Sequence, residues 1–163
     1  MTADWTLRPA DAGQGPALTR LAAEAFALYV PRIGRRPAPM DADYAKLIAD
    51  GHARVALDAA GRVQGFVVDY PSDDGAAWLI ETVAVAPALQ GRGLGGRLLA
   101  AAEAAGRAAG AGVARLYTNA AMAETLAFYP KRGWREVDRR TEEGFERVYF
   151  EKPLKEERDA TGL

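Results

Sequence analysis

Val83-Ala-Val-Ala-Pro-Ala-Leu-Gln-Gly-Arg-Gly-Leu-Gly-Gly-Arg-Leu-Leu99 joins an apolar strand to a long helix through a run of glycines, and it is the most informative stretch of this chain. A helix that begins in glycines exposes several backbone N–H groups with no side chain in the way, and the helix dipole favours negative charge there. Arg92 and Arg97 add positive charge. The stretch therefore predicts a phosphate-binding loop; the alternative is a packing turn that binds nothing.

Two common phosphate-binding motifs fit this loop poorly. Gly91, Gly93 and Gly96 have the Gly-x-Gly-x-x-Gly spacing of dinucleotide-binding proteins. In those folds, however, the strand runs straight into the glycines, whereas Pro87-Ala-Leu-Gln90 intervenes here. Asn119 stands where such a protein has an acid after the next strand. No Lys-Ser or Lys-Thr pair follows the glycines, which argues against an ATP-type loop.

Hydrophobic periodicity and the positions of proline and glycine predict the elements around the loop. Apolar residues recur at helical spacing from Pro16, and Pro31 is expected to end that helix. Strands are expected over 5–8, 52–58, 62–70, 78–86, 113–118, 134–138 and 145–152, further helices over 41–49, 97–109 and 121–129, a loop over 32–40 and a polar tail over 155–163.

The helix over 97–109 decides the topology. Because it connects two strands as a crossover, the strands over 78–86 and 113–118 are expected to be parallel neighbours. The other connections are short and favour antiparallel pairing. The predicted fold class is therefore α/β (α+β), with a single mixed, mostly antiparallel sheet flanked by helices.

Length and composition limit what the protein can be. A chain of 163 residues and 17.4 kDa has the size of one domain, which we place at residues 1–154. Lys plus Arg number 21 and Asp plus Glu 22, so no overall positive field favours nucleic acid or an anionic membrane. The absence of cysteine excludes a thiol nucleophile, and a single histidine, His52, excludes a multi-histidine metal site. With no signal peptide or membrane span evident, we expect a cytoplasmic protein without a metal.

Three segments of the chain resemble the GCN5-related N-acetyltransferase (GNAT) superfamily. Thr6-Leu-Arg-Pro9 is similar to that family's opening strand, and Glu81 to Leu99 to its cofactor-binding strand, loop and helix. Ala123-Glu-Thr-Leu-Ala-Phe-Tyr-Pro-Lys-Arg-Gly-Trp134 is similar to its late helix and turn. The last two motifs, in this order, are far more specific than either alone. The resemblance implies a bulge that splays the cofactor strand from the strand over 113–118.

The same resemblance implies acetyl-CoA as co-substrate. The loop glycines would bring backbone donors to its pyrophosphate, and the pantetheine arm would pair with the edge of residues 82–85 like a further strand. The Val83 N–H would donate to the thioester carbonyl, and Asn119 resembles a cofactor-contacting asparagine, although it would also suit a turn cap. The expected cofactor-binding residues are Val83, Ala84, Val85, Gln90, Gly91, Arg92, Gly93, Leu94, Gly95, Gly96, Asn119 and Phe128.

Acetyl transfer from a thioester to an amine requires an acid for the departing sulfur. By resemblance, Tyr129 matches the family's tyrosine that donates this proton, and a phenol is able to do so. Pro130 follows directly and disfavours helical geometry at Tyr129, which would aim the hydroxyl differently. The alternative is a half-buried core tyrosine.

The reaction also requires a base, because the amine must lose a proton. Glu81 is the best-placed candidate, since strand alternation puts it on the same side as Val83 and Val85. The alternatives are a solvated strand-end carboxylate, and a water chain from Asp69 or Tyr70.

The arginine-rich loop is expected to form the acceptor pocket. Arg32, Arg35 and Arg36 are flanked by Tyr29 and Tyr44 in the region where acetyltransferases of this kind bind the acceptor. Guanidinium groups bind carboxylates and phosphates bidentately, so the cluster predicts a clamp for an anionic group; the alternative is a solvated loop. We expect substrate contacts from Tyr29, Arg32, Arg36 and Tyr44.

These features predict an N-acetyltransferase that moves an acetyl group from acetyl-CoA to a primary amine of a small molecule, amino acid or peptide. Without a cysteine to carry an acyl intermediate, direct attack in a ternary complex is the expected route. The alternative is a non-catalytic acyl-CoA sensor or interaction module, because a fold alone does not give function. No nucleic-acid or membrane partner is expected, and the sequence leaves a homodimer open.

Overall fold

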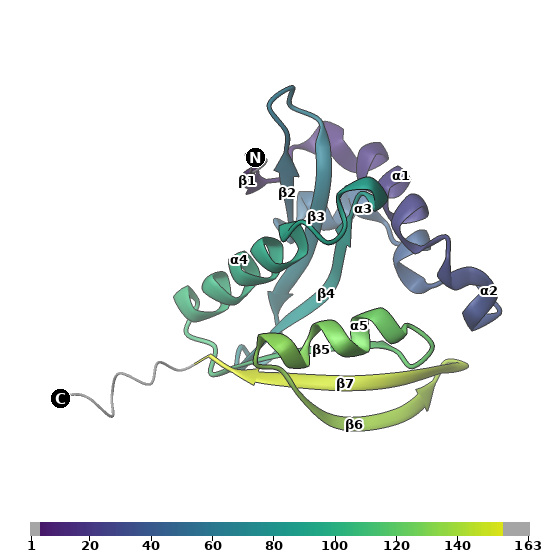
Figure 1. The fold of residues 1–163 in the computed structure, drawn as a ribbon. Coiled ribbons are helices and arrows are strands. Elements are labelled where there is room, and N and C mark those ends of the chain that lie inside the picture. The colour runs from purple at the N-terminus through teal and green to yellow at the C-terminus, as the bar shows by residue number, and fades with distance from the viewer. Residues whose placement is uncertain (1–3, 155–163) are drawn as a thin grey trace.

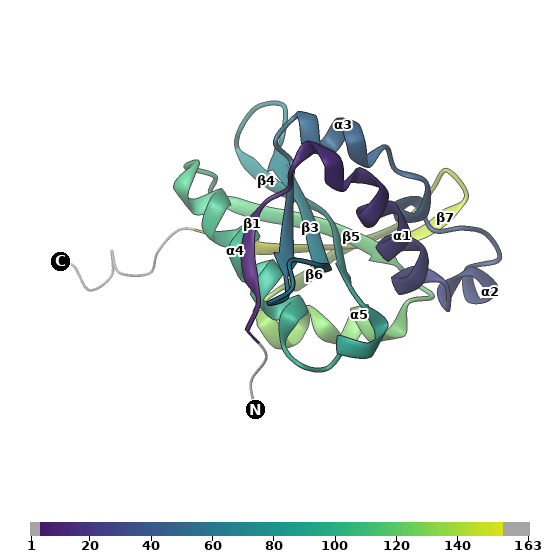
Figure 2. The same ribbon diagram turned by 90° about the horizontal axis from the view of Figure 1, so that it is seen from above.

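One seven-stranded sheet organises the molecule, in the order β1-β2-β3-β4-β5-β7-β6 (Figures 1 and 2). The computed structural model describes residues 4–154. The strands are β1 (Thr6–Pro9), β2 (Ala53–Leu57), β3 (Val63–Pro71), β4 (Ala77–Val85), β5 (Val113–Asn119), β6 (Arg135–Glu142) and β7 (Phe145–Pro153). Strands β4 and β5 are parallel to each other, and the other neighbouring strands of this sheet pair antiparallel. The predicted fold class is confirmed.

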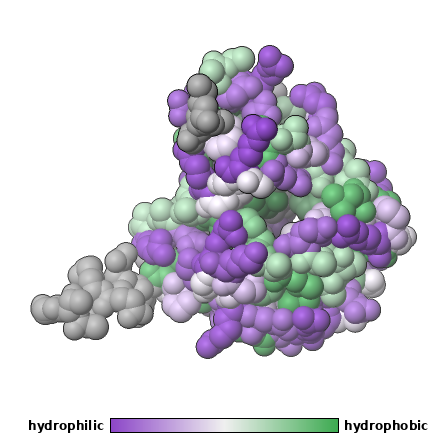
Figure 3. Space-filling view, viewed as in Figure 1, coloured by the Kyte–Doolittle hydropathy of each residue, from purple (hydrophilic) through white to green (hydrophobic). Residues whose placement is uncertain are grey.

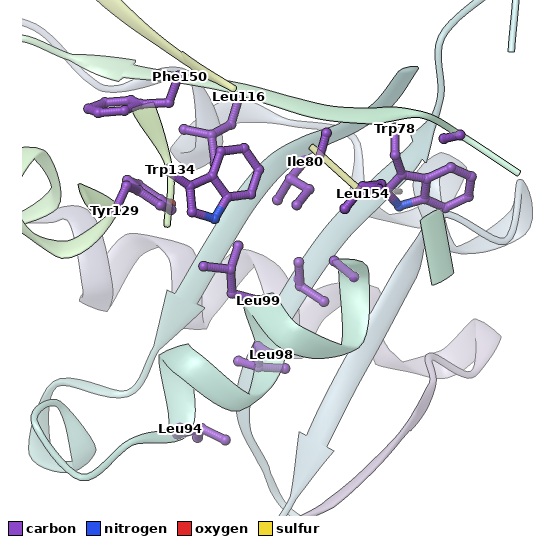
Figure 4. Close-up of a cluster of buried hydrophobic side chains, with 14 of the residues drawn as sticks. Trp78, Ile80, Leu94, Leu98, Leu99, Leu116, Tyr129, Trp134, Phe150 and Leu154 are labelled. Atoms are coloured by element: carbon purple, nitrogen blue, oxygen red, sulfur yellow. The ribbon is translucent and has the colours of Figure 1, made fainter. Parts of the chain in front are cut away.

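Within residues 4–154, five helices cover the two faces of the sheet. They are α1 (Gly15–Phe26), α2 (Tyr29–Ile33), α3 (Tyr44–Ala49), α4 (Leu94–Ala108) and α5 (Ala123–Phe128), with short 3₁₀ turns at 12–14, 38–41, 87–89 and 130–132. One buried cluster forms where α4 packs, and it contains Leu98, Trp78 and Phe150 (Figure 4). A second cluster forms on the other face, where α1 and α3 cover Phe66 and Val68.

Strands β4 and β5 pair only at one end, from Ala77 opposite Val113 to Leu79 opposite Arg115. Beyond Leu79 the two strands diverge (Figure 1). On its other side, β4 changes register against β3 between Ile80 and Thr82, so that Glu81 is the extra residue of a β-bulge. A bulge bends its strand. The bend and the divergence together create a gap between β4 and β5.

Two helix boundaries differ from the sequence-based expectation. The first helix ends at Phe26 instead of Pro31, and Pro31 lies inside the separate helix α2. A proline in the first turn of a helix removes only an N–H that has no acceptor there, so α2 tolerates it. Helix α4 begins at Leu94, three residues before its expected start, so Gly95 and Gly96 lie in its first turn. The tail expected over 155–163 lies outside the described residues.

Candidate functional site

The glycine loop presents unpaired backbone donors at the start of α4. Gly91 and Gly93 adopt left-handed φ angles of 84° and 91°, which side chains disfavour, and Gly93 caps the helix. In the part of the chain that the structure describes, no backbone carbonyl accepts from the N–H groups of residues 91–96. A helix of this length adds its dipole at the same place. The loop therefore presents the exposed backbone N–H groups that the sequence predicted at the start of this helix.

These glycines line a groove that we call the glycine-loop cleft. Figure 3 shows the surface hollowed between the part formed by the first four strands and the part that carries α5. The cleft is lined by Ala25, Phe26, Tyr29, Val83, Ala84, Val85, Gln90, Gly91, Gly93, Gly95, Gly96, Glu124, Thr125, Phe128, Tyr129 and Arg132. Most of the expected cofactor-binding residues lie here. Arg92, Leu94 and Asn119 do not line the cleft, and the side chain of Leu94 is fully buried in the core.

Arg132, which the sequence did not single out, supplies the positive charge of the cleft. Its guanidinium carbon lies 3.8 Å from the centre of the Phe128 ring, and its Nη1 donates to the Phe128 carbonyl at 2.9 Å. A Cβ on Gly96 would lie 3.3 Å from its Nε, which places the guanidinium beside the first turn of α4. Arg92, by contrast, is exposed. A stacked cation beside free amides suits a diphosphate.

A second cavity, of about 140 Å³, lies in the gap between β4 and β5, and we call it the strand-gap cavity. It is lined by Phe26, Ile33, Pro37, Ala38, Pro39, Glu81, Thr82, Val83, Tyr117, Thr118, Asn119, Met122, Thr125, Tyr129, Phe145 and Arg147. Phe26, Val83, Thr125 and Tyr129 line both this cavity and the glycine-loop cleft. A molecule in the cleft and a molecule in the cavity would therefore meet at these four residues.

Tyr129 stands at this junction as the C-cap residue of α5, with the helical backbone geometry that Pro130 was expected to disfavour. Its φ of −74° and ψ of −43° are helical although a proline follows, and α5 passes directly into the turn at 130–132. The ring packs against Trp134 and Phe150, and no described residue bonds its hydroxyl. Burial raises the pKa of the Tyr129 phenol, and the Arg132 charge opposes this only in part. The phenol therefore holds its proton at neutral pH.

Glu81 occupies the bulge and lines the strand-gap cavity. The Tyr70 hydroxyl donates to its carboxylate at 2.5 Å. Burial, and then this hydrogen bond, raises the pKa of Tyr70. The expectation that simple alternation puts Glu81 on the same side as Val83 is wrong, because the bulge interrupts the alternation. Ile80 and Val83 are three residues apart, yet both pack with the cluster under α4.

Asp69 is committed to a structural role. Its side chain is buried, and one carboxylate oxygen accepts from Arg54 at 2.6 Å and from the Trp78 indole at 2.8 Å. It lines neither the cleft nor the cavity. Of the two expected starting points for a water chain, Tyr70 contacts Glu81 directly and Asp69 does not lie at the site.

The structure separates the residues of the expected arginine clamp. Arg32 pairs with Glu124 at 2.8 Å beside Tyr29, at the glycine-loop cleft, and Arg36 pairs with Asp41. Arg35 donates to the Glu143 carbonyl at 3.0 Å and lies over the Phe145 ring, so it links the 34–37 loop to the β6–β7 turn.

Tyr44 and Asn119 also take structural positions. Tyr44 is 2% exposed, packs edge-on against Phe66 and donates its hydroxyl to the Pro39 carbonyl, so it does not line the strand-gap cavity. The Asn119 side-chain oxygen accepts from the Ala121 N–H at 2.8 Å, which is the turn cap considered from the sequence.

The cation of the strand-gap cavity is Arg147, which the sequence did not reveal. Its guanidinium lies 4.3 Å from the centre of the Tyr117 ring and pairs with Glu142 at 3.3 Å. The chain brings β5 and β7 together only in the folded sheet, so no local motif marks this group. Among residues 4–154, no group of three histidine or acidic side chains could hold a metal ion, and no helix is long and apolar enough to cross a membrane.

The mixed sheet with its diverging parallel pair, the free amides at the start of α4 and the tyrosine at the junction are the features that the resemblance implied. A family model described as an acetyltransferase (GNAT) domain matches residues 49–136, which is more than half of the chain. The chain therefore belongs to the GNAT family.

Solved structures agree with this assignment, whereas no curated protein matches the chain. PaiA N-acetyltransferase from Thermoplasma acidophilum, in complex with coenzyme A, is 17% identical with a TM-score of 0.77 over 92% of this chain and 99% of its own. The ribosomal-protein-S18-alanine N-acetyltransferase from Escherichia coli is 18% identical with a TM-score of 0.72 over 94% and 96%. Nourseothricin acetyltransferase is 26% identical with a TM-score of 0.59. The matched region covers 63% of this chain and 65% of that protein.

Proposed function

We propose that this protein transfers an acetyl group from acetyl-CoA to a primary amine of a small molecule, amino acid or peptide by direct attack in a ternary complex. The observation that carries the proposal is the position of Tyr129, which holds its proton where the glycine-loop cleft and the strand-gap cavity meet. Coenzyme A in the complex of the Thermoplasma relative supports the choice of co-substrate. The domain boundary at 154, the cytoplasmic location and the homodimer stay predictions.

The glycine-loop cleft fits the co-substrate, which supplies the acetyl group. The free N–H groups of residues 91–96 and the guanidinium of Arg132 would bind the pyrophosphate. The open edge of β4 beyond Leu79 would pair with the amide groups of the pantetheine arm, and the Val83 N–H would donate to the thioester carbonyl. Gly95, whose added Cβ would meet Phe128 and Val85, keeps the floor of the cleft open.

Two residues would handle the protons. At pH 7 a lysine-like amine lies roughly 3.4 pKa units, or about 4.6 kcal/mol, from its neutral form, whereas for a leaving thiol with a pKa near 8.5 the thiolate and thiol forms differ by only about 1.5 units, or about 2 kcal/mol. The ammonium form would first lose one proton to solvent, and Glu81 would then accept a proton from the neutral amine nitrogen, directly or through one water, as the C–N bond forms. Tyr129 would donate its proton to sulfur as the C–S bond breaks.

Thiol release from acetyl-CoA across a panel of primary amines tests the proposal. Turnover with at least one amine supports it, whereas tight CoA binding without turnover on any amine would establish the sensor alternative. CoA should also raise the melting temperature, because a ligand that binds only the folded state stabilises it. Absence of CoA binding contradicts both functions.

Tyr129→Phe tests the assigned acid. We expect turnover to fall by up to about 10² to 10⁴-fold. The affinity for CoA and the melting temperature should stay near those of the parent protein, because no described residue bonds the hydroxyl. A variant that binds acetyl-CoA poorly but turns over normally once saturated would show that Tyr129 binds the co-substrate instead.

A further inference from the structure

Thr82 lies in a wall of the strand-gap cavity, and neither the resemblance nor the proposed reaction uses its side chain. It follows the bulge residue Glu81, faces Val68 across the β3–β4 ladder and is 5% exposed. Val68 belongs to the buried cluster under α1, so the Thr82 side chain lies on that face of the sheet. Thr82 also lines the strand-gap cavity.

The Thr82 hydroxyl is buried and has no hydrogen-bond partner among the described residues. Buried hydroxyl groups are nearly always paired, because losing water without gaining a partner is unfavourable. Valine has the same branched shape and would fill the position without this penalty. The packing therefore does not explain a threonine here.

Other polar groups of the cavity are already paired within the protein. The Thr118 hydroxyl lies 2.8 Å from the Thr125 hydroxyl, the Asn119 side chain accepts from Ala121, and Glu81 accepts from Tyr70. Of the three threonines that line this cavity, Thr82 is thus the one whose buried hydroxyl has no partner among the described residues.

We propose that the Thr82 hydroxyl binds the amino group of the acceptor, an inference that rests on the proposed function. A neutral primary amine has two N–H groups and one lone pair. One N–H would donate to the Thr82 oxygen and the other would face Glu81, so that the lone pair is left for the acetyl carbon. Thr82 keeps its own proton throughout: the amine proton goes to Glu81, and sulfur takes its proton from Tyr129.

This arrangement selects the class of acceptor. A secondary amine has one N–H, which cannot serve Thr82 and Glu81 together. The site should therefore acetylate a primary amine more efficiently than its N-methyl analogue, because a buried polar group left without a partner disfavours the wrong substrate.

Two substitutions at Thr82 separate the hydroxyl from the shape of the side chain. With the best amine of the panel, Thr82→Val should lower kcat/KM by roughly 5- to 100-fold and reduce the preference for the primary amine over its N-methyl analogue. Thr82→Ser, which keeps the hydroxyl, should restore kcat/KM to within about threefold. The KM for acetyl-CoA should change little in either variant.

Thr118→Val is the matched control for stability, because the same chemical change is made in the same cavity wall at a paired hydroxyl. Its melting temperature should fall, whereas that of Thr82→Val should stay equal or rise. Should Thr82→Val not fold, Thr82→Ala replaces it in the kinetic comparison, and the stability part of the inference is overturned.

The outcomes distinguish this inference from the proposed function. If the parent protein releases no thiol with any amine, the proposed function fails, and the inference fails with it. If the parent turns over and Thr82→Val keeps the parent's kcat/KM and selectivity, only the inference is overturned; a buried water then satisfies the hydroxyl.

Discussion

At the scale of the single residue, the positive charge of the glycine-loop cleft comes from Arg132 and not from Arg92, to which the sequence assigned it. Arg92 lies within the glycine run, yet its side chain is exposed and does not line the glycine-loop cleft. Arg132 lies 36 residues after Gly96 in the sequence, yet its Nε would lie 3.3 Å from a Cβ on Gly96 and its guanidinium stacks on Phe128. A stacked and hydrogen-bonded guanidinium is held in place before the ligand arrives, so it loses less freedom on binding.

The affinity for coenzyme A should therefore depend on Arg132 and hardly at all on Arg92. We expect Arg132→Gln to weaken CoA binding by roughly 10- to 100-fold, the loss typical of one charge-assisted hydrogen bond. Arg92→Gln, the matched control, should change it by less than about threefold, because an exposed charge is screened by solvent. Isothermal titration of both variants at one salt concentration measures the difference. Equal losses, or a larger loss for Arg92→Gln, would contradict the assignment.

At the scale of the element, the sequence predicts what local signals determine. The Ala- and Leu-rich run between glycines predicts α4, and a helix of that length between two strands predicts the parallel β4–β5 pair; both are present. The bulge at Glu81 has no such local signal, and only the family resemblance implied it; the break between α1 and α2 also has none, since α1 contacts the 38–41 turn only in the folded protein. For the same reason, groups that meet only through the folded sheet, such as Arg147 and Thr82, cannot be assigned from spacing.

Helix α4 gives a case in which local propensity and packing predict opposite results. A helix with glycine at an interior position is usually less stable than the same helix with alanine there, by about 1 kcal/mol. Local propensity therefore predicts that Gly106→Ala stabilises α4. In the structure, a Cβ at Gly106 would lie 2.8 Å from Trp78 and from Leu154. We expect Gly106→Ala to destabilise the protein by about 1–3 kcal/mol, because the helix must move off β4.

Chemical denaturation measures this change, and Gly13→Ala is its control. A Cβ at Gly13 meets nothing within 4 Å, so that substitution should be neutral or stabilise the fold by up to about 1 kcal/mol. A gain in stability for Gly106→Ala would show that α4 packs less closely on β4 than described.

At the scale of the whole molecule, tyrosines from three separate elements share one electrostatic property. Tyr44 lies in α3, Tyr70 in β3 and Tyr129 after α5. Burial is the largest cause of a raised pKa in each; the Glu81 charge adds to it at Tyr44, and the hydrogen bond to Glu81 adds to it at Tyr70. The bulge carboxylate thus influences a residue in the α3 core and one beside the strand-gap cavity.

These raised pKa values predict a loss of stability in alkaline solution. An unfolded tyrosine titrates near pH 10, whereas the folded groups keep their protons above that pH. Because the folded pKa is the higher one, the stabilising contribution is fully present below about pH 10 and is lost as the pH rises further. The melting temperature should therefore stay nearly constant from pH 7 to about 9 and fall above about 10. Tyr129→Phe removes one of these phenols, so its melting temperature should fall less steeply over the same range; a slope equal to that of the parent would mean that Tyr129 titrates normally and is not enclosed at the junction of the two cavities.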